Sequence, residues 1–391
     1  MQANATTTTS IGAGTQPDSA ARVSGRIACI DWMRGLVMVL MTIDHASMAF
    51  DGSHLSRDSA MYPDATTMAL PAAEFFTRWI THICAPTFIF LAGASLAVSV
   101  ERRVLKGVGA WEIDKTIITR GLIIALLDLT LVSLGSGIIS LNVLLAIGLS
   151  MICMAPLRRL STPLMLGIAI GWMVLGEFVT AWFWQPPGPA SPLVSFFIAT
   201  SGGGLVSNKY PLIPWLAIMM MGWATGRYML LYQAGKRTMR PRNLLLVAGI
   251  IGLAVFVIVR GAQGYGDMFL PRMDGSWQQW LHVSKYPPSL TYYALELGLL
   301  FICLWFLAAI EPRIGVRPNG PFLVFGQTAM FFYLVHRLVM EIPATYFGLR
   351  GVGDLKTTYI VAFVLLILLY PACRWYRTVK AAHPESLLKY I

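Results

Sequence analysis

Long apolar runs recur along almost the whole chain, and they restrict the possible folds more than any other feature. A helix that crosses a membrane needs roughly 20 predominantly apolar residues. Ten segments reach or approach that length: 29–50, 78–100, 117–135, 139–156, 163–184, 211–232, 243–260, 289–310, 321–341 and 356–377. The sequence therefore predicts an all-α, polytopic membrane helix bundle of about ten transmembrane helices.

The connections between these runs alternate in charge. Every second connection is basic, and the basic residues are Arg22, Arg26, Arg102, Arg103, Lys106, Lys115, Arg158, Arg159, Lys236, Arg237, Arg240, Arg242, Arg313, Arg317, Arg374, Arg377 and Lys380. Because Lys and Arg are retained in cytoplasmic loops, both termini are expected in the cytoplasm. We expect one transmembrane domain over 26–380, a disordered cytoplasmic tail at 1–25 and a short cytoplasmic tail at 381–391.

Composition agrees with a membrane protein. Only 13% of residues are charged and 56% are hydrophobic, whereas soluble domains carry about 25% charged residues. The formal net charge of +11 could suggest nucleic acid, but the basic residues cluster in short loops between apolar runs, so no nucleic-acid partner is expected. The five cysteines are far apart and form no C-x-x-C pair, so no metal is expected. Membrane lipids are the expected partners, and the oligomeric state is open.

The first run carries ionisable residues that a membrane helix rarely tolerates: Asp31, Arg34, Asp44 and His45. Such groups cost a few kcal/mol each in a bilayer, so they usually face a cavity and pair. Eleven residues separate Arg34 from His45, which places both on one helix face, ~16 Å apart along the axis. Met38 and Met41 lie between them on that face. Asp31 can instead favour the helix dipole and pair with Arg34.

Other polar residues fall on later runs. Arg78 and His82 are four residues apart, at the outer end of the second run, and His336 lies near the outer end of the ninth. Three histidines from three helices therefore reach a similar depth, while Glu296 of the eighth run lies deeper. Structural readings stay open, because Arg78 could be an interfacial anchor and His336 a hydrogen-bonded packing residue.

Four stretches carry a family resemblance. The stretch "IDWMRGLVMVLMTIDH" (30–45) resembles the first helix of bacterial membrane proteins related to the heparan-alpha-glucosaminide N-acetyltransferase catalytic domain. The stretches "FFTRWITHICAPTFIFLAGAS" (75–95), "SKYPPSL" (284–290) and "VFGQTAMFFYLVH" (324–336) resemble later segments of that family. The D-x-x-R…H pattern is also similar to the acyltransferase-3 family.

The resemblance implies an integral protein of the bacterial inner membrane. It would move an acyl group, acetyl foremost, from cytosolic acyl-CoA to an amine or hydroxyl of a sugar on the far side. In the lysosomal branch the reactive histidine lies in the loop beyond the first helix, and His54 is its nearest counterpart here. The acyltransferase-3 pattern points to His45 instead, and we expect His45 to react.

The expected site therefore has three parts. Catalysis is assigned to His45, oriented by Asp44, with help from His82, and acyl-CoA binding is assigned to Arg34, Met38 and Met41. Acceptor binding is assigned to Arg78, Tyr293, Glu296 and His336. Either His45 removes a proton from the acceptor, with His82 or Tyr293 polarising the thioester carbonyl, or an acyl-histidine intermediate forms.

The sequence leaves two other functions open. A proton-coupled transporter or flippase of a glycan-related substrate could use the same buried groups, but the chain shows no internal repeat and no evident broken helix pair. A metalloenzyme using His45, His82 and His336 lacks any known ligand spacing.

Overall fold

The computed structural model describes residues 27–132, 139–202, 206–383, 385, 386 and 388, so the tail expected at 1–25 lies outside the described residues. The elements are α1 Ala28–Phe50, α2 Ala72–Ile80, α3 Cys84–Leu105, α4 Ala110–Leu127, the π-helical turn η2 Asp128–Val132, β1 Ile139–Leu141, α5 Val143–Leu157, α6 Thr162–Phe183, α7 Pro192–Phe197, β2 Val206–Asn208, α8 Leu212–Gln233, α9 Pro241–Ala262, α10 Trp277–Leu281, α11 Leu290–Ile314, α12 Pro321–Gln327, α13 Ala329–Tyr346 and α14 Leu355–Ala382.

Helices dominate, and each expected apolar run overlaps a helix or a pair of helices. Five segments of the described chain are long and apolar enough to cross a membrane: Ala72–Leu105 (α2 with α3), α6, α9, α11 and α14. A sixth is obtained if α12 and α13 are counted as one span. The protein is thus an integral membrane protein built from helices, while the full set of ten crossings stays a prediction.

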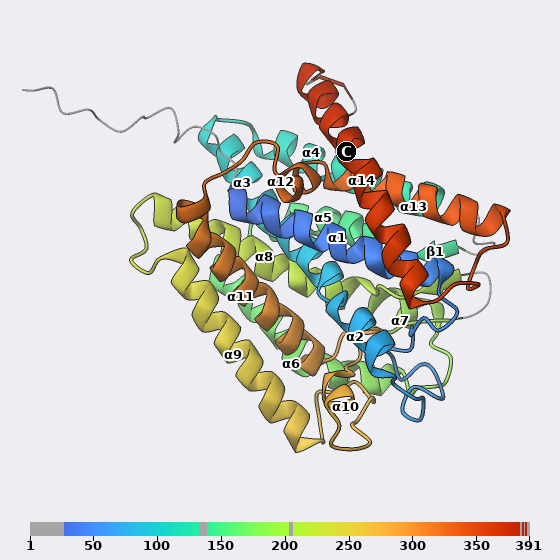
Figure 1. Ribbon diagram of the computed structural model, residues 1–391. Coiled ribbons are helices and arrows are strands. Elements are labelled where there is room, and N and C mark those ends of the chain that lie inside the picture. The colour runs from blue at the N-terminus through green and yellow to red at the C-terminus, as the bar shows by residue number, and fades with distance from the viewer. Residues whose placement is uncertain (1–26, 133–138, 203–205, 384, 387, 389–391) are drawn as a thin grey trace, which may run out of the picture.

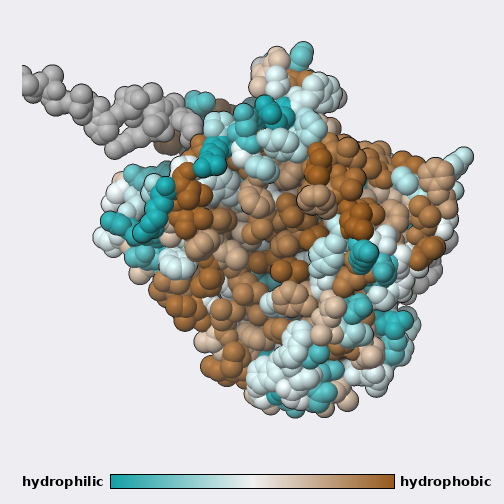
Figure 2. Space-filling view, in the orientation of Figure 1, coloured by the Kyte–Doolittle hydropathy of each residue, from teal (hydrophilic) through white to brown (hydrophobic). Residues whose placement is uncertain are grey.

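The surface agrees with this assignment. Figure 2 shows apolar residues across the middle of one face, with hydrophilic residues gathered above and below them. Large apolar side chains are exposed along the outer helices, for example Trp182 on α6, Ile258 on α9 and Phe363 on α14. Exposed apolar surface of this extent is stable only against lipid or another apolar partner.

Helix α1 runs through the middle of the bundle and packs against α3, α11, α12, α13 and α14 (Figure 1). Its contact with α12 is a close backbone crossing, because a Cβ on Gly35 would collide with the Phe322 carbonyl and one on Gly326 with the Asp31 carbonyl. The α3–α8 contact uses Gly93 in the same way. The polar residues of α1 are therefore inside the protein and not against lipid.

The ninth apolar run is broken. Helices α12 and α13 meet at an angle of 92°, and at the break the hydroxyl of Thr328 donates to the Val324 carbonyl, 2.8 Å away. The prediction that the chain has no broken helix pair is wrong at this point. The all-α prediction also misses one small feature, a two-stranded parallel ladder that pairs β1 with β2.

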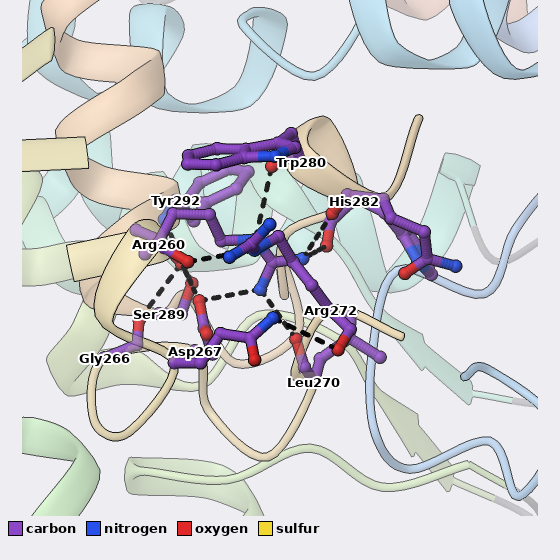
Figure 3. Close-up of polar contacts among 12 residues, drawn as sticks. Arg260, Gly266, Asp267, Leu270, Arg272, Trp280, His282, Ser289 and Tyr292 are labelled. Atoms are coloured by element: carbon purple, nitrogen blue, oxygen red, sulfur yellow. Dashed lines mark hydrogen bonds and ion pairs between the residues drawn. The ribbon is translucent and has the colours of Figure 1, made fainter. Parts of the chain in front are cut away.

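The connections 51–71 and 263–289 pack together at one end of the bundle, here called the cap end. Arg260, at the end of α9, is fully buried and organises the second connection (Figure 3). Its guanidinium pairs with Asp267 at 2.7 Å and donates to the carbonyls of Leu270, Gln279, Trp280 and His282. The opposite end, where Arg102, Arg103 and Lys106 lie, is called the basic end.

Candidate active site

Two histidines meet near the cap end of α1. Nδ1 of His45 lies 2.7 Å from Nε2 of His336 on α13. The two rings are within 10° of parallel and their centroids are 5.0 Å apart, which fits two rings joined edge to edge by an N–H···N bond better than two stacked faces. His336 is fully buried, whereas His45 is partly exposed. His45 is therefore the member of the pair that a substrate can reach.

The hydrogen bonds fix the tautomers of the neutral pair. Nδ1 of His336 lies 2.9 Å from the Phe332 carbonyl, which can only accept, so this nitrogen carries the proton. Nε2 of His336 then has a lone pair and accepts from Nδ1–H of His45. This leaves Nε2 of His45 unprotonated, so that nitrogen has a free lone pair and the chemistry of a base or nucleophile.

The residue before His45 belongs to a network of charges. Nη1 of Arg78 lies 2.6 Å from Asp44, and its Nε and Nη2 lie 3.0 and 2.6 Å from Asp58 in the first cap connection. Asp44 also accepts from Thr81. Although burial opposes the charged form, the Arg78 guanidinium holds the pKa of Asp58 well below its usual range. Arg78 thus ties the cap to α1 beside His45, and Asp44 does not hydrogen-bond to the His45 ring.

His82, Tyr293 and Glu296 make no hydrogen bond or ring contact with either histidine of the pair in the described part of the chain. His82 is buried and its Nε2 lies 3.3 Å from Asp58, but neither ring nitrogen has hydrogen-bond geometry with a described residue. Tyr293 donates to the Pro214 carbonyl, 2.9 Å away. Glu296 is 1% exposed and its Oε1 has no partner among the described residues. Three histidines therefore do not converge, and no group of three metal-ligand side chains was found in the described part of the chain.

His54, the alternative reactive residue, lies in the first cap connection. Its Nδ1 is 2.8 Å from the hydroxyl of Ser47, which also donates to Asp51. Burial, together with the positive charge of Arg78, lowers the pKa of His54. Its ring is thus engaged with the end of α1, whereas His45 faces His336.

A cavity of about 550 Å³ begins at the basic end and follows α1 inward. Its basic rim includes Arg102, Arg103, Lys106, Arg120 and Lys380. Farther along it is lined by Asp31, Arg34, Met38 and Tyr333. The cavity therefore joins a cationic mouth to the neighbourhood of the histidine pair, because the Tyr333 ring lies 6.2 Å from that of His45 and 5.5 Å from that of His336.

Arg34 is held in the wall of this cavity. It pairs with Asp31 at 3.0 Å, donates to the Leu91 carbonyl at 3.2 Å and bonds to the hydroxyl of Ser95. Its side chain keeps 21% of its surface exposed, so it remains accessible to an anion. Met38 also lines the cavity, but Met41 does not; Met41 is buried in the core.

The sequence argument missed Asp58, Tyr333 and Arg120. Tyr333 could have been predicted, because it stands three residues before His336 on one helix face. Arg120 was a visible signal too, since it is a charged residue inside an apolar run. Asp58 had no local signal, because its role depends on how the cap connection folds back onto Arg78.

A family model described as heparan-alpha-glucosaminide N-acetyltransferase, catalytic, matches residues 26–260. The chain belongs to this family. The match covers more than half of the chain and includes Arg34, His45 and Arg78, but not His336. No curated protein matches the chain.

Family membership indicates a membrane acetyltransferase, and the family in general uses acetyl-CoA as its donor. The cavity chemistry fits such a donor. A cationic mouth suits the phosphates, and the continuation past Met38 toward Tyr333 suits an unbranched arm that carries the thioester.

Proposed function

We propose that the protein transfers an acyl group, acetyl foremost, from acyl-CoA on the cytoplasmic side to an amine or hydroxyl of a sugar or glycan on the opposite side of a bacterial inner membrane. The observation that carries the proposal is the cavity from the basic end to Tyr333, whose ring contacts both histidines. The ~16 Å between Arg34 and His45 is then the length that the pantetheine arm has to span.

The reaction needs a base, and Nε2 of His45 supplies it. As the acceptor nitrogen or oxygen attacks the thioester carbonyl, Nε2 takes the proton of the acceptor. The carbon–sulfur bond then breaks, and the proton is returned to the departing sulfur of CoA. In the alternative, Nε2 attacks the thioester itself and an acyl-histidine forms before the acceptor reacts.

Tyr333 is the proposed donor to the thioester oxygen. It lines the cavity and is 6% exposed, and its hydroxyl makes no hydrogen bond to a described residue. A hydroxyl placed there would stabilise the negative charge that develops on the carbonyl oxygen. Tyr293 is less suited to this role, because its hydroxyl is already committed to Pro214.

The acceptor is proposed to approach from the cap end. His45 is partly exposed there, and Arg78 and Glu296 lie on neighbouring elements. Glu296, with one carboxyl oxygen unpartnered within the described chain, supports a contact to an acceptor hydroxyl or amine. Sugars offer several such groups, and contacts to Arg78 and Glu296 are compatible with many different sugars.

The proposed function is tested most directly by measuring whether the acetyl group is transferred across the membrane. Proteoliposomes would carry glucosamine inside as a probe acceptor, and labelled acetyl-CoA would be added outside to protein whose basic end faces outward. We expect labelled acetylglucosamine inside the vesicles, and none with His45→Ala. Product formed only when both substrates are on one side would overturn the proposal.

One observation favours the transporter alternative, namely the 92° break between α12 and α13, since broken helices often line transport sites. The same proteoliposomes decide between the functions. Proton flux driven by a glycan substrate without acyl-CoA would favour transport, and its absence together with acetyl transfer would exclude it.

A further inference from the structure

The donor cavity has a side chamber of about 230 Å³ between α3, α4 and α5. Leu96, Ser99, Arg103, Arg120 and Met151 line both spaces, so the two are adjacent. The chamber branches off at the basic end, far along α1 from the histidine pair.

Positive charge gathers where the two spaces join. Arg103 comes from α3 and Arg120 from α4, and the charges of Arg34 and Arg103 both act on Arg120. Neither Arg103 nor Arg120 has an ion-pair partner among the described residues, whereas Arg158 and Arg159 near the same end share Asp114. Among the described residues that line either space, Asp31 is the one carboxylate, and it is paired with Arg34. Guanidinium groups held together in this way favour a bound polyanion.

The rest of the chamber is mostly apolar. Val100, Ile113 and Ile117 form its walls, and the hydroxyls of Ser99 and Thr116 are its small polar groups. Apolar walls with a few hydrogen-bonding groups are typical of sites for small molecules and cofactors, and a purine base presents apolar faces and a polar edge to such walls. A phosphate alone would not need these walls.

We propose that the side chamber binds the nucleotide end of the donor, with the purine base between the apolar walls and the phosphates between Arg103 and Arg120. This inference rests on the proposed function and adds to it a basis for donor selectivity. The arm then leaves the junction along α1, past Arg34 and Met38, toward Tyr333. The chamber thus distinguishes a CoA thioester from a thioester on a shorter pantetheine carrier, although the reacting ends are identical.

Calorimetric binding to the detergent-purified full chain tests the proposal without a known acceptor. The probes are CoA, dephospho-CoA, phosphopantetheine and pantetheine, which lose the nucleotide end step by step. For the wild type we expect affinity to fall at each step. Arg120→Met should weaken CoA binding about 10- to 100-fold, as expected for one lost charge-assisted contact, and leave pantetheine binding within about twofold.

A second variant tests the contribution of the purine base to binding separately from that of the phosphates. Thr116→Phe fills the chamber without removing charge, so it should weaken CoA and dephospho-CoA and spare phosphopantetheine. Arg240→Met is the matched control, because Arg240 is an exposed arginine that lines neither space. It should bind all four probes like the wild type.

The outcomes that overturn the proposal are distinct. Equal wild-type affinity for CoA and phosphopantetheine would leave the proposed function standing and remove the nucleotide site. An equal loss for all probes with Arg120→Met would assign Arg120 a structural role and overturn the proposal. Displacement of CoA by an equal concentration of phosphatidylglycerol would assign the chamber to lipid. Binding of none of the probes would overturn the proposed function as well.

Discussion

At the scale of residues, the orientation of His45 depends on a neighbour of the same kind. The buried ring of His336 accepts from Nδ1–H of His45 and is itself fixed by the Phe332 carbonyl. A carboxylate in this position would raise the basicity of His45 through its charge, whereas a neutral imidazole chiefly sets the tautomer and the ring plane. The sequence predicts that His336 binds the acceptor, and we propose from these hydrogen bonds that it also positions the His45 ring.

We predict that His336→Phe lowers kcat of acetyl transfer by about 10- to 100-fold, because His45 loses the partner that fixes its tautomer. The KM for acetyl-CoA should change little, since His336 does not line the donor cavity. His336→Gln, whose amide oxygen can accept from His45, should recover part of the lost rate. Steady-state kinetics on both variants at matched protein levels check this, and equal rates for the two would contradict it.

The sequence predicted relationships within one helix better than relationships between helices. Arg34 and His45 are on the same helix, so their spacing alone fixed their relative position. The pairing of His45 with His336 joins residues 291 positions apart, and their depths were predicted but not their contact. Asp58 could not be predicted at all, because a loop residue has no periodicity that indicates its partner.

At the scale of elements, the crossing of α1 and α12 shapes the cavity of about 550 Å³, which is the proposed donor cavity. Gly326 lets α12 lie directly on α1, and the residues just after it, Gln327 to Met330, line the cavity together with Gly326 itself. The apolar pattern predicted one straight span over 321–341. It did not reveal the bend, because the short interruption at Gly326, Gln327 and Thr328 is also tolerated inside an unbroken membrane helix.

We predict that Gly326→Ala destabilises the protein by about 1–3 kcal/mol and weakens CoA binding, because the added Cβ collides with the Asp31 carbonyl and pushes α12 outward. Gly171→Ala in α6 is the matched control, since a Cβ there meets nothing within 4 Å. It should leave CoA binding unchanged and stabilise α6 by up to about 1 kcal/mol. Thermal unfolding and calorimetry measure both effects, and equal behaviour of the two variants would argue against the crossing as described.

The cap end should make the protein sensitive to acid. Because burial lowers the pKa of His54, the folded protein binds that proton more weakly than the unfolded chain, whose histidine titrates near pH ~6.5. The stabilising effect of neutral His54 is therefore fully present above about pH 6.5 and is lost as the pH falls below it. Asp58, with its pKa held low by Arg78, stays ionised through this range.

We therefore predict that the unfolding temperature in detergent falls between about pH 7 and pH 5, and that it falls less for His54→Gln. A glutamine can keep a hydrogen bond to Ser47 but does not titrate. The decrease should not vanish, because burial also lowers the pKa of His282 in the second cap connection. Identical pH profiles for the wild type and His54→Gln would contradict this assignment.

At the scale of the whole molecule, the two ends of the bundle differ in charge and in the residues that they expose. The basic end opens into a cationic cavity, and the cap end holds the Arg78 network and the partly exposed face of His45. Between them, α1 joins the two ends through the protein interior. Composition and apolar runs were sufficient to predict a helical membrane protein. The cavity could not be predicted, because it is the space left between seven helices (α1, α3, α4, α5, α12, α13 and α14) whose packing no single run determines.

Whether His45 and Arg34 act on acyl-CoA is decided by measuring acyl-CoA binding and slow thioester hydrolysis with the purified wild type, His45→Ala and Arg34→Ala. We expect His45→Ala to bind acetyl-CoA with wild-type affinity but no longer to hydrolyse it. Arg34→Ala should bind it about 10- to 100-fold more weakly, because one charge-assisted contact is lost. Undiminished hydrolysis by His45→Ala, or no acyl-CoA binding by the wild type, would contradict the account.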